Sequence, residues 1–414
     1  KCTKDACGAT GACVFAPIIG CNGYCTEDKQ CDDNNPCTVG EACTNNVCTA
    51  GNQVITSTIG GSAGAPSFMD GAAPKSKFNR PHDVAVGPKG AVYVADYYTQ
   101  RVRKIDGSTV STLAGSKNAG FKDGKGAAAW FNSPAGIEVG GDGVVYVSDR
   151  YNHAIRKITA DGTTTTLAGN ASAGGNDGKG DKARFNQPIG LTVNAAGVLH
   201  VADYANHRIR KVAADGTTTT VAGSGAGFAD GKGAAAKFSG PVDVVDDGKG
   251  VLYVAEINNH RIRKITSDGT VSTFAGTGQA GLLNGGVKTA RFYNPFGLAL
   301  DSAGRLYVSS YRYHRIRVIE NGAVYPLTGS AAGFVDGAGG RFYHPTGMAN
   351  DAAGALYLAD WQNARVRKVV RTAGACAIGG ACWADGTLNP AKACERCDAA
   401  KSAKAWSPIA GCKP

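Results

Sequence analysis

The middle of the chain alternates short runs of β-branched and aromatic residues with clusters of glycine, asparagine and aspartate, and this alternation repeats. The unit that begins at Phe185 contains four such runs, "GLTV", "VLHVAD", "RIRKV" and "TTTTVAG", which are typical of β-strands. The phenylalanine recurs every 50 to 54 residues, at Phe78, Phe131, Phe185, Phe238, Phe292 and Phe342. Repeats of this length predict a solenoid or a propeller, and four antiparallel strands without a helix describe a propeller blade. The sequence therefore predicts an all-β fold, a six-bladed β-propeller.

The last unit is incomplete, and a matching strand lies at the opposite end of the repeat region. The unit stops after "RVRKVV" (365–370) without a fourth strand, whereas "VITSTIGG" (54–61) matches the fourth strand "VSTLAG" of the first unit. We therefore expect the N-terminal strand to complete blade six, which closes the ring and protects its edges. The predicted domains are a Cys-rich module at 1–53, the propeller at 54–372 and a second Cys-rich module at 373–414.

The repeated pattern P-x-G-[IL]-x-V…G-x-[LV]-Y-V-A-D…N-H-R-I-R-K resembles the NHL repeat, named after Asn-His-Leu, where this chain has Asn-His-Arg. The "TTLAG…GF.DG.G.AA.F" linker resembles the bacterial branch of those repeats. The resemblance covers about residues 54–372 and implies a propeller. For function it implies only that such propellers serve as binding platforms, scaffolds or occasionally enzymes.

The 14 cysteines lie only in the two terminal segments, which resemble Cys-rich modules of secreted bacterial surface proteins. They are Cys2, Cys7, Cys13, Cys21, Cys25, Cys31, Cys37, Cys43 and Cys48, then Cys376, Cys382, Cys394, Cys397 and Cys412. Short Cys-dense segments bury too little apolar area to fold alone, so disulfides and an extracellular or cell-surface location are expected. Zinc is the alternative, since Cys394 and Cys397 form a CxxC, but no second CxxC or paired histidine accompanies it. Both counts are odd, so one bridge between the modules, or between chains, would pair the set.

A basic octet such as "NNHRIRKI" (258–265) recurs in every unit and has a structural interpretation. The second strand ends in an acid at Asp96, Asp149, Asp203, Glu256 and Asp360, with Ser310 in the fifth unit. The third strand opens with Arg101, Arg208, Arg261, Arg315 and Arg365, with Ala154 the exception. This acid and this arginine would brace the turn between them by charge-assisted hydrogen bonds. A second arginine lies two positions along and is expected to pack between blades: Arg103, Arg156, Arg210, Arg263, Arg317 and Arg367.

The other interpretation makes these turns a ligand-binding face. Its candidate residues are Tyr97, Tyr98, Arg101, Trp130, Tyr151, His153, Tyr204, His207, Arg208, His260, Arg261, Tyr311, Tyr313, His314, Arg315, Trp361 and Arg365. Aromatic rings stack on sugar rings and arginines pair with anions. The net charge is +11, so an anionic polysaccharide or a protein is the expected partner, and the extracellular setting disfavours intracellular nucleic acid. A solvated basic face is the alternative.

Two aspartates are candidates for a cation site in the central channel. Asp83 and Asp243 stand near the start of the first strand in blades one and four, which lie opposite each other, where the other blades have glycine. A turn at the strand entry is the alternative role. The recurrent "DGKG" sequence at 123, 177 and 230 offers one carboxylate per loop, so a glycine-dependent turn is favoured over a calcium loop.

The sequence contains no convincing catalytic constellation, because His82 and His344 alone approach the channel and one or two histidines make no site. No cofactor is expected, and no apolar run is long enough to span a membrane. The expected function is a secreted or cell-surface, non-enzymatic binding or scaffold module. The alternatives are a structural subunit of an extracellular assembly, which would self-associate through its Cys-rich ends, and a metal-dependent propeller lyase or lactonase.

Overall fold

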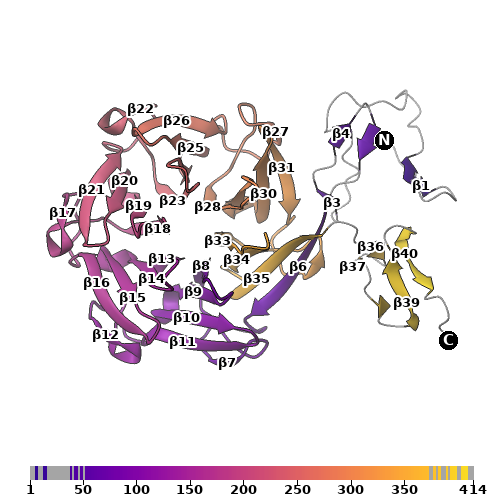
Figure 1. Ribbon diagram of the computed structural model, residues 1–414, viewed down its shortest axis with the longest axis horizontal. Coiled ribbons are helices and arrows are strands. Elements are labelled where there is room, and N and C mark those ends of the chain that lie inside the picture. Colours follow the sequence, from indigo (N-terminus) through magenta and orange to yellow (C-terminus); the bar gives the residue numbers. More distant parts are fainter. Residues whose placement is uncertain are drawn as a thin grey trace. The chain divides into compact units, whose positions relative to one another are not determined.

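The computed structural model describes residues 52–372 continuously and, outside that range, short strand segments in both terminal regions. Six sheets in this range surround a central axis as the blades of a propeller (Figure 1). The first strands of the six blades pack against one another in a closed circle. They are β8 (Pro81–Val86), β13 (Pro134–Val139), β18 (Pro188–Val193), β23 (Pro241–Asp246), β28 (Pro295–Leu300) and β33 (Pro345–Asn350), which begin blades one to six. The predicted six-bladed β-propeller is confirmed.

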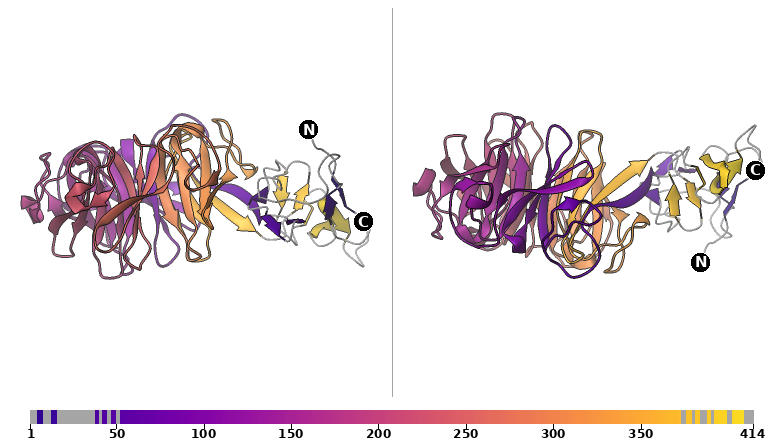
Figure 2. Two further views of the ribbon diagram at one scale, coloured as in Figure 1. Left: turned by 90° about the horizontal axis from the view of Figure 1, so that it is seen from above. Right: turned by 90° about the horizontal axis from the view of Figure 1, so that it is seen from below.

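Three further strands follow outward in each blade, and all neighbouring strands are antiparallel. Seen edge-on, they run across the thickness of the ring (Figure 2). The second strands are β9 (Val92–Asp96), β14 (Val145–Asp149), β19 (Leu199–Asp203), β24 (Leu252–Glu256), β29 (Leu306–Ser310) and β34 (Leu356–Asp360). The third strands are β10 (Arg101–Asp106), β15 (Ala154–Ile158), β20 (Arg208–Val212), β25 (Arg261–Ile265), β30 (Arg315–Glu320) and β35 (Arg365–Thr372). The fourth strands of blades one to five are β11 (Thr109–Gly115), β16 (Thr163–Gly169), β21 (Thr217–Ala222), β26 (Thr270–Ala275) and β31 (Ala323–Thr328).

Blade six takes its fourth strand from the N-terminal side of the repeats, as the sequence predicted. This strand is β6 (Asn52–Gly60), and the sheet order is β6-β35-β34-β33, with β3 (Thr38–Val39) paired beyond β6. The first and last parts of the repeat region therefore share one sheet. Because the ring closes through strand pairing, no blade is left with an incomplete edge.

Each blade also has a short fifth strand that the sequence did not predict. The linker that enters a blade first pairs with that blade's fourth strand, so that Gly124 lies opposite Thr164. These strands are β7 (Gly71–Ala72), β12 (Gly124–Lys125), β17 (Gly178–Lys179), β22 (Gly231–Lys232), β27 (Gly285–Gly286) and β32 (Gly337–Ala338). Within "DGKG", Gly124 (φ 157°) and Gly126 (φ 55°) adopt positive φ, and a Cβ on Gly124 would meet the backbone of Ala128. Two residues are too short a run for the period of strands to be recognised.

Short 3-10 helices occur at two places in the repeat. In the turn between second and third strands they are η2 (Tyr97–Thr99), η4 (Arg150–Asn152), η6 (Tyr204–Asn206) and η8 (Tyr311–Tyr313), and in the linkers they are η3 (Gly126–Ala128), η5 (Gly180–Lys182) and η7 (Gly233–Ala235). The turn between second and third strands ends in a residue with left-handed backbone, such as His153 (φ 50°) or His207 (φ 55°). This tight turn returns the chain directly into the third strand.

The terminal regions contribute further short strands. They are β1 (Asp5–Cys7), β2 (Cys13–Phe15), β4 (Ala42–Thr44), β5 (Val47–Thr49), β36 (Cys376–Ile378), β37 (Ala381–Trp383), β38 (Leu388–Asn389), β39 (Lys392–Asp398) and β40 (Ser402–Pro408). The side chains of the 14 cysteines lie outside the described part of the structure, so their pairing stays a prediction. Among the described residues, no helix is long and apolar enough to cross a membrane.

The repeated phenylalanines fill the spaces between neighbouring blades. All six are at most 1% exposed: Phe78, Phe131, Phe185, Phe238, Phe292 and Phe342. Phe131, for example, belongs to a cluster with Val102 of blade one and Ile137 and Val147 of blade two. Burial of one such ring contributes about 1.5 to 3 kcal/mol to folding. The fixed spacing of phenylalanine therefore reflects one core contact made in every blade.

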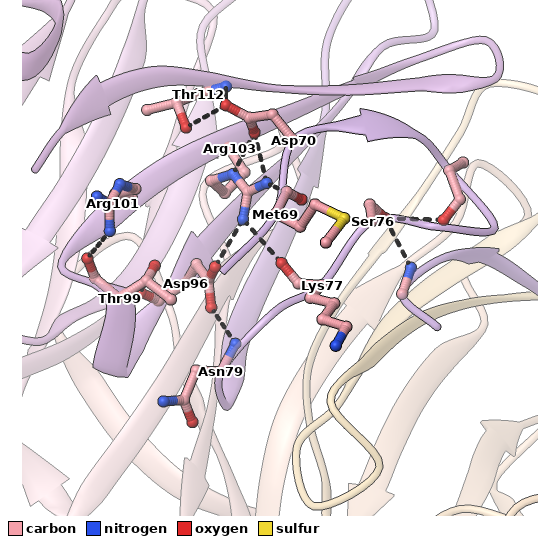
Figure 3. Close-up of polar contacts among 12 residues, drawn as sticks. Met69, Asp70, Ser76, Lys77, Asn79, Asp96, Thr99, Arg101, Arg103 and Thr112 are labelled. Atoms are coloured by element: carbon pink, nitrogen blue, oxygen red, sulfur yellow. Dashed lines mark hydrogen bonds and ion pairs between the residues drawn. The ribbon is translucent and has the colours of Figure 1, made fainter. Parts of the chain in front are cut away.

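The second arginine of each octet is fully buried and forms the polar centre of its blade. In blade one, Arg103 Nη1 donates to Asp96 Oδ2 (2.9 Å) and to the carbonyl of Lys77 (3.1 Å), while Nη2 donates to the carbonyl of Met69 (2.9 Å; Figure 3). Arg103 Nε also donates to Asp70 Oδ1 of the linker at 3.1 Å. We call the buried arginine and these partners the arginine site of a blade.

Aromatic rings and the outer strand enclose the arginine site. The rings of Phe68 and Phe78 lie over the Arg103 guanidinium, with centroids 4.7 and 5.0 Å from Cζ. Asp70 Oδ2 accepts the backbone N–H (3.2 Å) and the hydroxyl (2.9 Å) of Thr112 (Figure 3). The aspartate of the glycine-rich linker thus joins the linker, the buried arginine and the fourth strand, which adds a role that the sequence reasoning did not assign to it.

The acid that ends the second strand pairs with the second arginine, and the predicted pairing with the first arginine was wrong. The pairs are Asp96–Arg103, Asp149–Arg156, Asp203–Arg210, Glu256–Arg263 and Asp360–Arg367, at 2.6 to 2.9 Å and with both side chains fully buried. Asp96 lies directly opposite Arg101 in the strand register and diagonally from Arg103. The diagonal partner is preferred because a buried carboxylate needs a cation that is also shielded from water, and long side chains reach across a diagonal.

Candidate functional site

A pocket of about 300 Å³ opens where the turns between second and third strands surround the axis. Two positions of the repeat supply nearly all of its lining. In every blade except the second, the residue after the first proline contributes to the floor: His82, Ile189, Val242, Phe296 and Thr346. The residue after the strand-ending acid gives the wall, with Tyr97, Arg150, Tyr204, Ile257, Tyr311 and Trp361, and Tyr98 completes the lining. We call this the axial pocket.

The arginine sites position the wall of the axial pocket. Asp149, for example, is held by Arg156 and also accepts the backbone N–H of Asn132 at 2.7 Å and the side-chain amide of Asn152 at 2.8 Å. The next residue, Arg150, begins the 3-10 turn and lines the pocket. A fixed acid therefore precedes each wall residue in five of the six blades, while the wall residue itself varies from blade to blade.

Aromatic rings contact one another across the pocket. The His82 ring stacks on Tyr97, with centroids 5.3 Å apart and planes 20° apart, and meets Phe296 and Trp361 edge-on at 5.3 Å. Trp361 also lies 5.3 Å from Tyr97. Burial raises the pKa of Tyr97 to about 12, so its hydroxyl is neutral at physiological pH. The pocket thus offers aromatic edges and faces together with a neutral phenol.

One arginine gives the axial pocket its charge. Arg150 Nη2 donates to Gln187 Oε1 (3.2 Å) and Nη1 to the Tyr97 hydroxyl (3.5 Å), and Cζ lies 5.5 Å from the Tyr204 ring. Arg150 Nε is buried and has no hydrogen-bond partner among the described residues. The lining contains no aspartate or glutamate. The pocket is therefore electropositive and its cation has no carboxylate beside it.

The floor histidine is held as a neutral ring. His82 is 4% exposed, and its Nδ1 lies 3.1 Å from the carbonyl of Ala135. Burial, with the nearby Arg150 charge, lowers the pKa of His82 to about 3. A neutral ring can satisfy that carbonyl by carrying its proton on Nδ1. His82 is then fixed between blades one and two and does not gain a proton near neutral pH.

Below the floor, at a constriction near the axis, lies a small cavity of about 10 Å³ whose lining includes Asp83 and Asp243. Asp83 accepts the backbone N–H groups of Val84 (2.8 Å) and, in the next blade, Ile137 (3.0 Å). Asp243 does the same with Val244 (2.9 Å) and Leu298 (2.7 Å). Both carboxylates therefore join first strands of neighbouring blades.

The electrostatics of this constriction favour protonated carboxylates. Burial, together with the charge of Asp243, raises the pKa of Asp83 well above its usual range, and burial raises that of Asp243 to about 7. Glycine is required beside them, because a Cβ on Gly347 or Gly190 would collide with these side chains. Within the described residues no group of three or more His, Cys, Asp or Glu could hold a metal ion. The two aspartates predicted as cation candidates thus bind backbone N–H groups.

Comparison with known families agrees with the repeat. The model described as "NHL repeat" matches residues 78–105, 131–158 and 185–212, which run from the anchor phenylalanine to the end of the third strand in blades one to three. Blades one to three therefore contain NHL repeats. Blades four to six have the same strands and, in blades four and six, the same arginine site.

Two curated relatives match about two thirds of this chain over part of their own length. "Protein SUPPRESSOR OF QUENCHING 1, chloroplastic" of Arabidopsis thaliana is 32% identical over 283 residues, which cover 63% of this chain and 27% of that protein. "NHL repeat-containing protein 2" of Bos taurus is 31% identical over 317 residues, covering 66% of this chain and 44% of that protein. The chain spans less than half the length of each.

Solved structures show the same fold at low sequence identity. An auxiliary nutrient binding protein from Bacteroides thetaiotaomicron has a TM-score of 0.60 at 16% identity, covering 79% of this chain and 78% of that one. The gluconolactonase XC5397 from Xanthomonas campestris has a TM-score of 0.52 at 15% identity, covering 77% and 90%. At these identities the likeness concerns the propeller fold alone.

The NHL propeller brings five of the predicted ligand-face residues into the axial pocket: Tyr97, Tyr98, Tyr204, Tyr311 and Trp361. The other predicted residues lie outside its lining: Arg101, Trp130, Tyr151, His153, His207, Arg208, His260, Arg261, Tyr313, His314, Arg315 and Arg365. Sequence reasoning missed Arg150, Ile257 and the floor residues other than His82, which it had placed near the channel. The signal was available, because Arg150 follows its acid as Tyr97 follows Asp96.

The four turn histidines of the NHL propeller join neighbouring blades. The Nδ1 of His153, His207, His260 and His314 accepts the backbone N–H of Gln187, Gly240, Asn294 and His344, respectively, at 3.1 to 3.3 Å. In blade one Gln100 takes this place, and its Oε1 accepts the N–H of Ser133. Partial burial lowers the pKa of all four histidines. Their repetition thus has a structural reason.

The first arginines extend the arginine sites. Arg101, Arg261 and Arg365 lie 3.9, 3.9 and 3.7 Å from the ring centroids of Phe68, Phe228 and Phe334 in the linkers. Where the linker has Gly175 in place of phenylalanine, Arg208 donates to its carbonyl at 3.1 Å. The linker phenylalanine is thus sandwiched between a first and a second arginine, which accounts for the pair of arginines in the octet.

Proposed function

We propose that this NHL propeller is a non-enzymatic binding module whose axial pocket takes an anionic, ring-bearing ligand, such as an acidic sugar at the end of a glycan. The observation that carries the proposal is the placement of Arg150. It is the one charged side chain in an otherwise aromatic and aliphatic lining without a carboxylate. A guanidinium with an unpaired buried nitrogen suits a carboxylate ligand.

The size and chemistry of the pocket support a single ring as the bound unit. A volume of about 300 Å³ is at the lower end of small-molecule sites, which combine apolar walls with a few placed polar groups. Tyr98 is 54% exposed and lies 5.9 Å from the Trp361 ring, so both can contact a ligand that enters from solvent. Aromatic rings present flat apolar faces to the C–H side of a sugar.

Binding is favoured over catalysis by the state of the groups at the axis. His82 is neutral with its Nδ1 engaged, and Asp83 and Asp243 are occupied by backbone N–H groups below the floor. Among the structural neighbours, one is described as nutrient-binding and one as a gluconolactonase, so the fold likeness does not choose between the two. The proposed setting is extracellular, because Cys-dense terminal segments are typical of secreted proteins.

Calorimetric titration of the full chain with glucuronate and with glucose tests this proposal. We expect glucuronate to bind in preference to glucose, and Arg150→Ala to weaken glucuronate binding at least tenfold. Arg312→Ala is the matched control, because Arg312 lies beside Tyr311, 5.9 Å from its ring, but does not line the pocket. If Arg150→Ala and Arg312→Ala lose the same amount of glucuronate affinity, the charge acts as a solvated basic face and not as a site. If the wild type binds glucose as tightly as glucuronate, the carboxylate of the ligand plays no role.

A second candidate function, a subunit of a covalent assembly, is supported by the odd numbers of cysteines, nine before Phe78 and five after Phe342. Intact mass and gel mobility without reductant test it on native material. A ladder of species that collapses on reduction supports the assembly. A monomer without free thiols supports a bridge between the two ends and leaves the binding proposal unaffected.

A further inference from the structure

Blade five departs from the other blades at its arginine site. The second strand ends in Ser310, where the other five blades have aspartate or glutamate. The linker also differs, since Asn284 occupies the position of Asp70, Asp123, Asp177 and Asp230. The arginine is nevertheless present, as Arg317, and is fully buried. Blade five has therefore kept the cation and lost both carboxylates.

Arg317 retains only the neutral partners of the site. Nη1 donates to the carbonyl of Arg291 and Nη2 to the carbonyl of Leu283, both at 2.6 Å. The Phe292 ring centroid lies 4.6 Å from Cζ. Within residues 52–372 no ion pair joins Arg317 to a carboxylate. The equivalent two carbonyls are also bound in blades one to four, beside the carboxylates, so they do not compensate for the missing negative charge.

The charge of Arg317 remains at neutral pH. Burial, together with the positive charge of Arg315, lowers the pKa of Arg317 to about 10. The side chain is therefore still a cation at pH 7, in a place where a second cation lies nearby. A buried charge without a counter-ion is costly, and proteins as a rule pair it or change its protonation.

The other blades show which donors converge on the missing carboxylate. In blade one, Asp96 accepts the N–H of the residue after the anchor phenylalanine (Asn79, 2.8 Å) and a hydrogen bond from Arg103 Nη1 (2.9 Å). The equivalent donors in blade five are the N–H of Tyr293 and the guanidinium of Arg317. Ser310 is 1% exposed, and its Oγ has no hydrogen-bond partner among the described residues, so its hydroxyl is a third available donor.

We propose that blade five binds a small monovalent anion, of which chloride is the abundant example, in the place that the carboxylate occupies in the other five blades. The serine side chain lacks the carboxylate group of aspartate, and the anion would take the place of that group. The anion would accept hydrogen bonds from Ser310, Arg317 and the Tyr293 N–H and would neutralise the buried guanidinium. Bulky anions such as phosphate do not fit a space enclosed by buried side chains. None of the three residues Ser310, Arg317 and Tyr293 lines the axial pocket.

Thermal unfolding of the full chain in sodium chloride and in sodium gluconate, at equal ionic strength and pH 7, tests the proposal. An anion that binds only the folded state raises stability with its concentration, so a tenfold increase in chloride above its dissociation constant adds about 1.4 kcal/mol. We expect the unfolding temperature to rise with chloride or bromide and to stay flat in gluconate. Identical curves in chloride and gluconate would overturn the proposal.

Two substitutions of one residue separate a bound anion from a general salt effect. Ser310→Asp restores the carboxylate, so we expect a higher unfolding temperature in gluconate and no further rise with chloride. Ser310→Asn fills the same space without charge and is expected to lose the chloride dependence without the gain in stability. If Ser310→Asp keeps the full chloride dependence, the anion does not bind at this place and the proposal fails.

A matched variant in another blade, with a direct view of the anion, completes the test. Asp149→Ser combined with Asp123→Asn gives blade two the same residues as blade five at both carboxylate positions and is expected to add a second chloride-dependent increment. Crystals soaked in bromide are expected to show anomalous density beside Arg317 in the wild type and none in Ser310→Asp. Density absent from the wild type at saturating bromide would also overturn the proposal.

Discussion

Asp149 and Arg150 are neighbours in the chain and belong to two regions with opposite properties. Asp149 is fully buried in the arginine site, where its charge is neutralised by Arg156 at 2.6 Å. Arg150 lines the axial pocket without a carboxylate beside it. The acid position is aspartate or glutamate in five blades, whereas the next position is Tyr, Arg, Tyr, Ile, Tyr and Trp around the ring. The constant positions of this repeat make the buried contacts that hold the blades together, and we call these contacts the frame. The position after the acid varies from blade to blade, and its side chains line the candidate site.

The comparison also explains why the basic octet misleads when it is taken as a surface. Three of its positions, the histidine and two arginines, are used inside the frame, as contacts between blades or around the linker phenylalanine. The positive charge of the axial pocket comes from Arg150, which directly precedes the octet of blade two and has no charged equivalent among the wall residues of the other blades. A high count of basic residues is therefore a poor guide to where an anion would bind.

The largest expected effect is the loss of stability when the buried arginine of one blade is removed. Arg156→Ala leaves Asp149 buried without its partner, and such losses cost about 3 to 5 kcal/mol. We expect the urea midpoint to fall accordingly at an unchanged slope. Lys157→Ala, one residue along and partly exposed, is the control and is expected to change stability by less than about 0.5 kcal/mol. A loss from Arg156→Ala of the same small size would mean that the arginine site is not what holds the blade.

The next largest effect is the acid sensitivity of the pocket floor. His82 has a folded pKa of about 3, below its usual 6.5, so the folded state favours the neutral ring. Its stabilising contribution is complete above pH 6.5 and is lost as the pH falls toward 3, by about 2 kcal/mol between pH 6.5 and 5. His82→Val, which copies Val242 of blade four, should remove this part of the pH dependence. Denaturation curves at a series of pH values that fall equally in both proteins would contradict it.

Substitutions of Arg150 and Arg156 should have opposite effects: the first should reduce ligand affinity and the second should reduce stability. Arg150→Ala removes a partly buried side chain with neutral partners, so we expect the free energy of unfolding to change by less than about 1 kcal/mol. The affinity for an acidic sugar, in contrast, should fall at least tenfold, which corresponds to about 1.4 kcal/mol. Urea denaturation and calorimetric titration of the same preparation measure both. A large loss of stability in Arg150→Ala would place this arginine in the frame and remove the distinction.

The sequence predicted the propeller because its period, its alternation and the displaced fourth strand at 54–61 are all local signals. The sequence pointed to the wrong arginine as the partner of the acid. Arg101 and Arg103 are both close to Asp96 in sequence, and only the structure shows that Arg103 is the fully buried one. The fifth strands were not predicted, because a strand of two residues is too short to show an alternation of apolar and polar side chains. The axial pocket was half predicted: aromatic wall residues attract attention one by one, whereas Arg150 and Ile257 are recognised only when the six blades are aligned position by position.

The smallest expected effect tests whether the turn histidines belong to the frame or to the ligand face. His207 Nδ1 accepts the N–H of Gly240 at 3.1 Å, and His207→Ala removes that acceptor at a cost of about 1 kcal/mol. His207→Gln should keep most of the stability, because Gln100 already makes the equivalent bond to Ser133 in blade one. Neither variant should alter glucuronate affinity, since His207 does not line the axial pocket. If His207→Gln retains stability but loses affinity, the histidine recognises the ligand directly, and the binding surface extends outward from the axial pocket over the turns that the sequence first suggested.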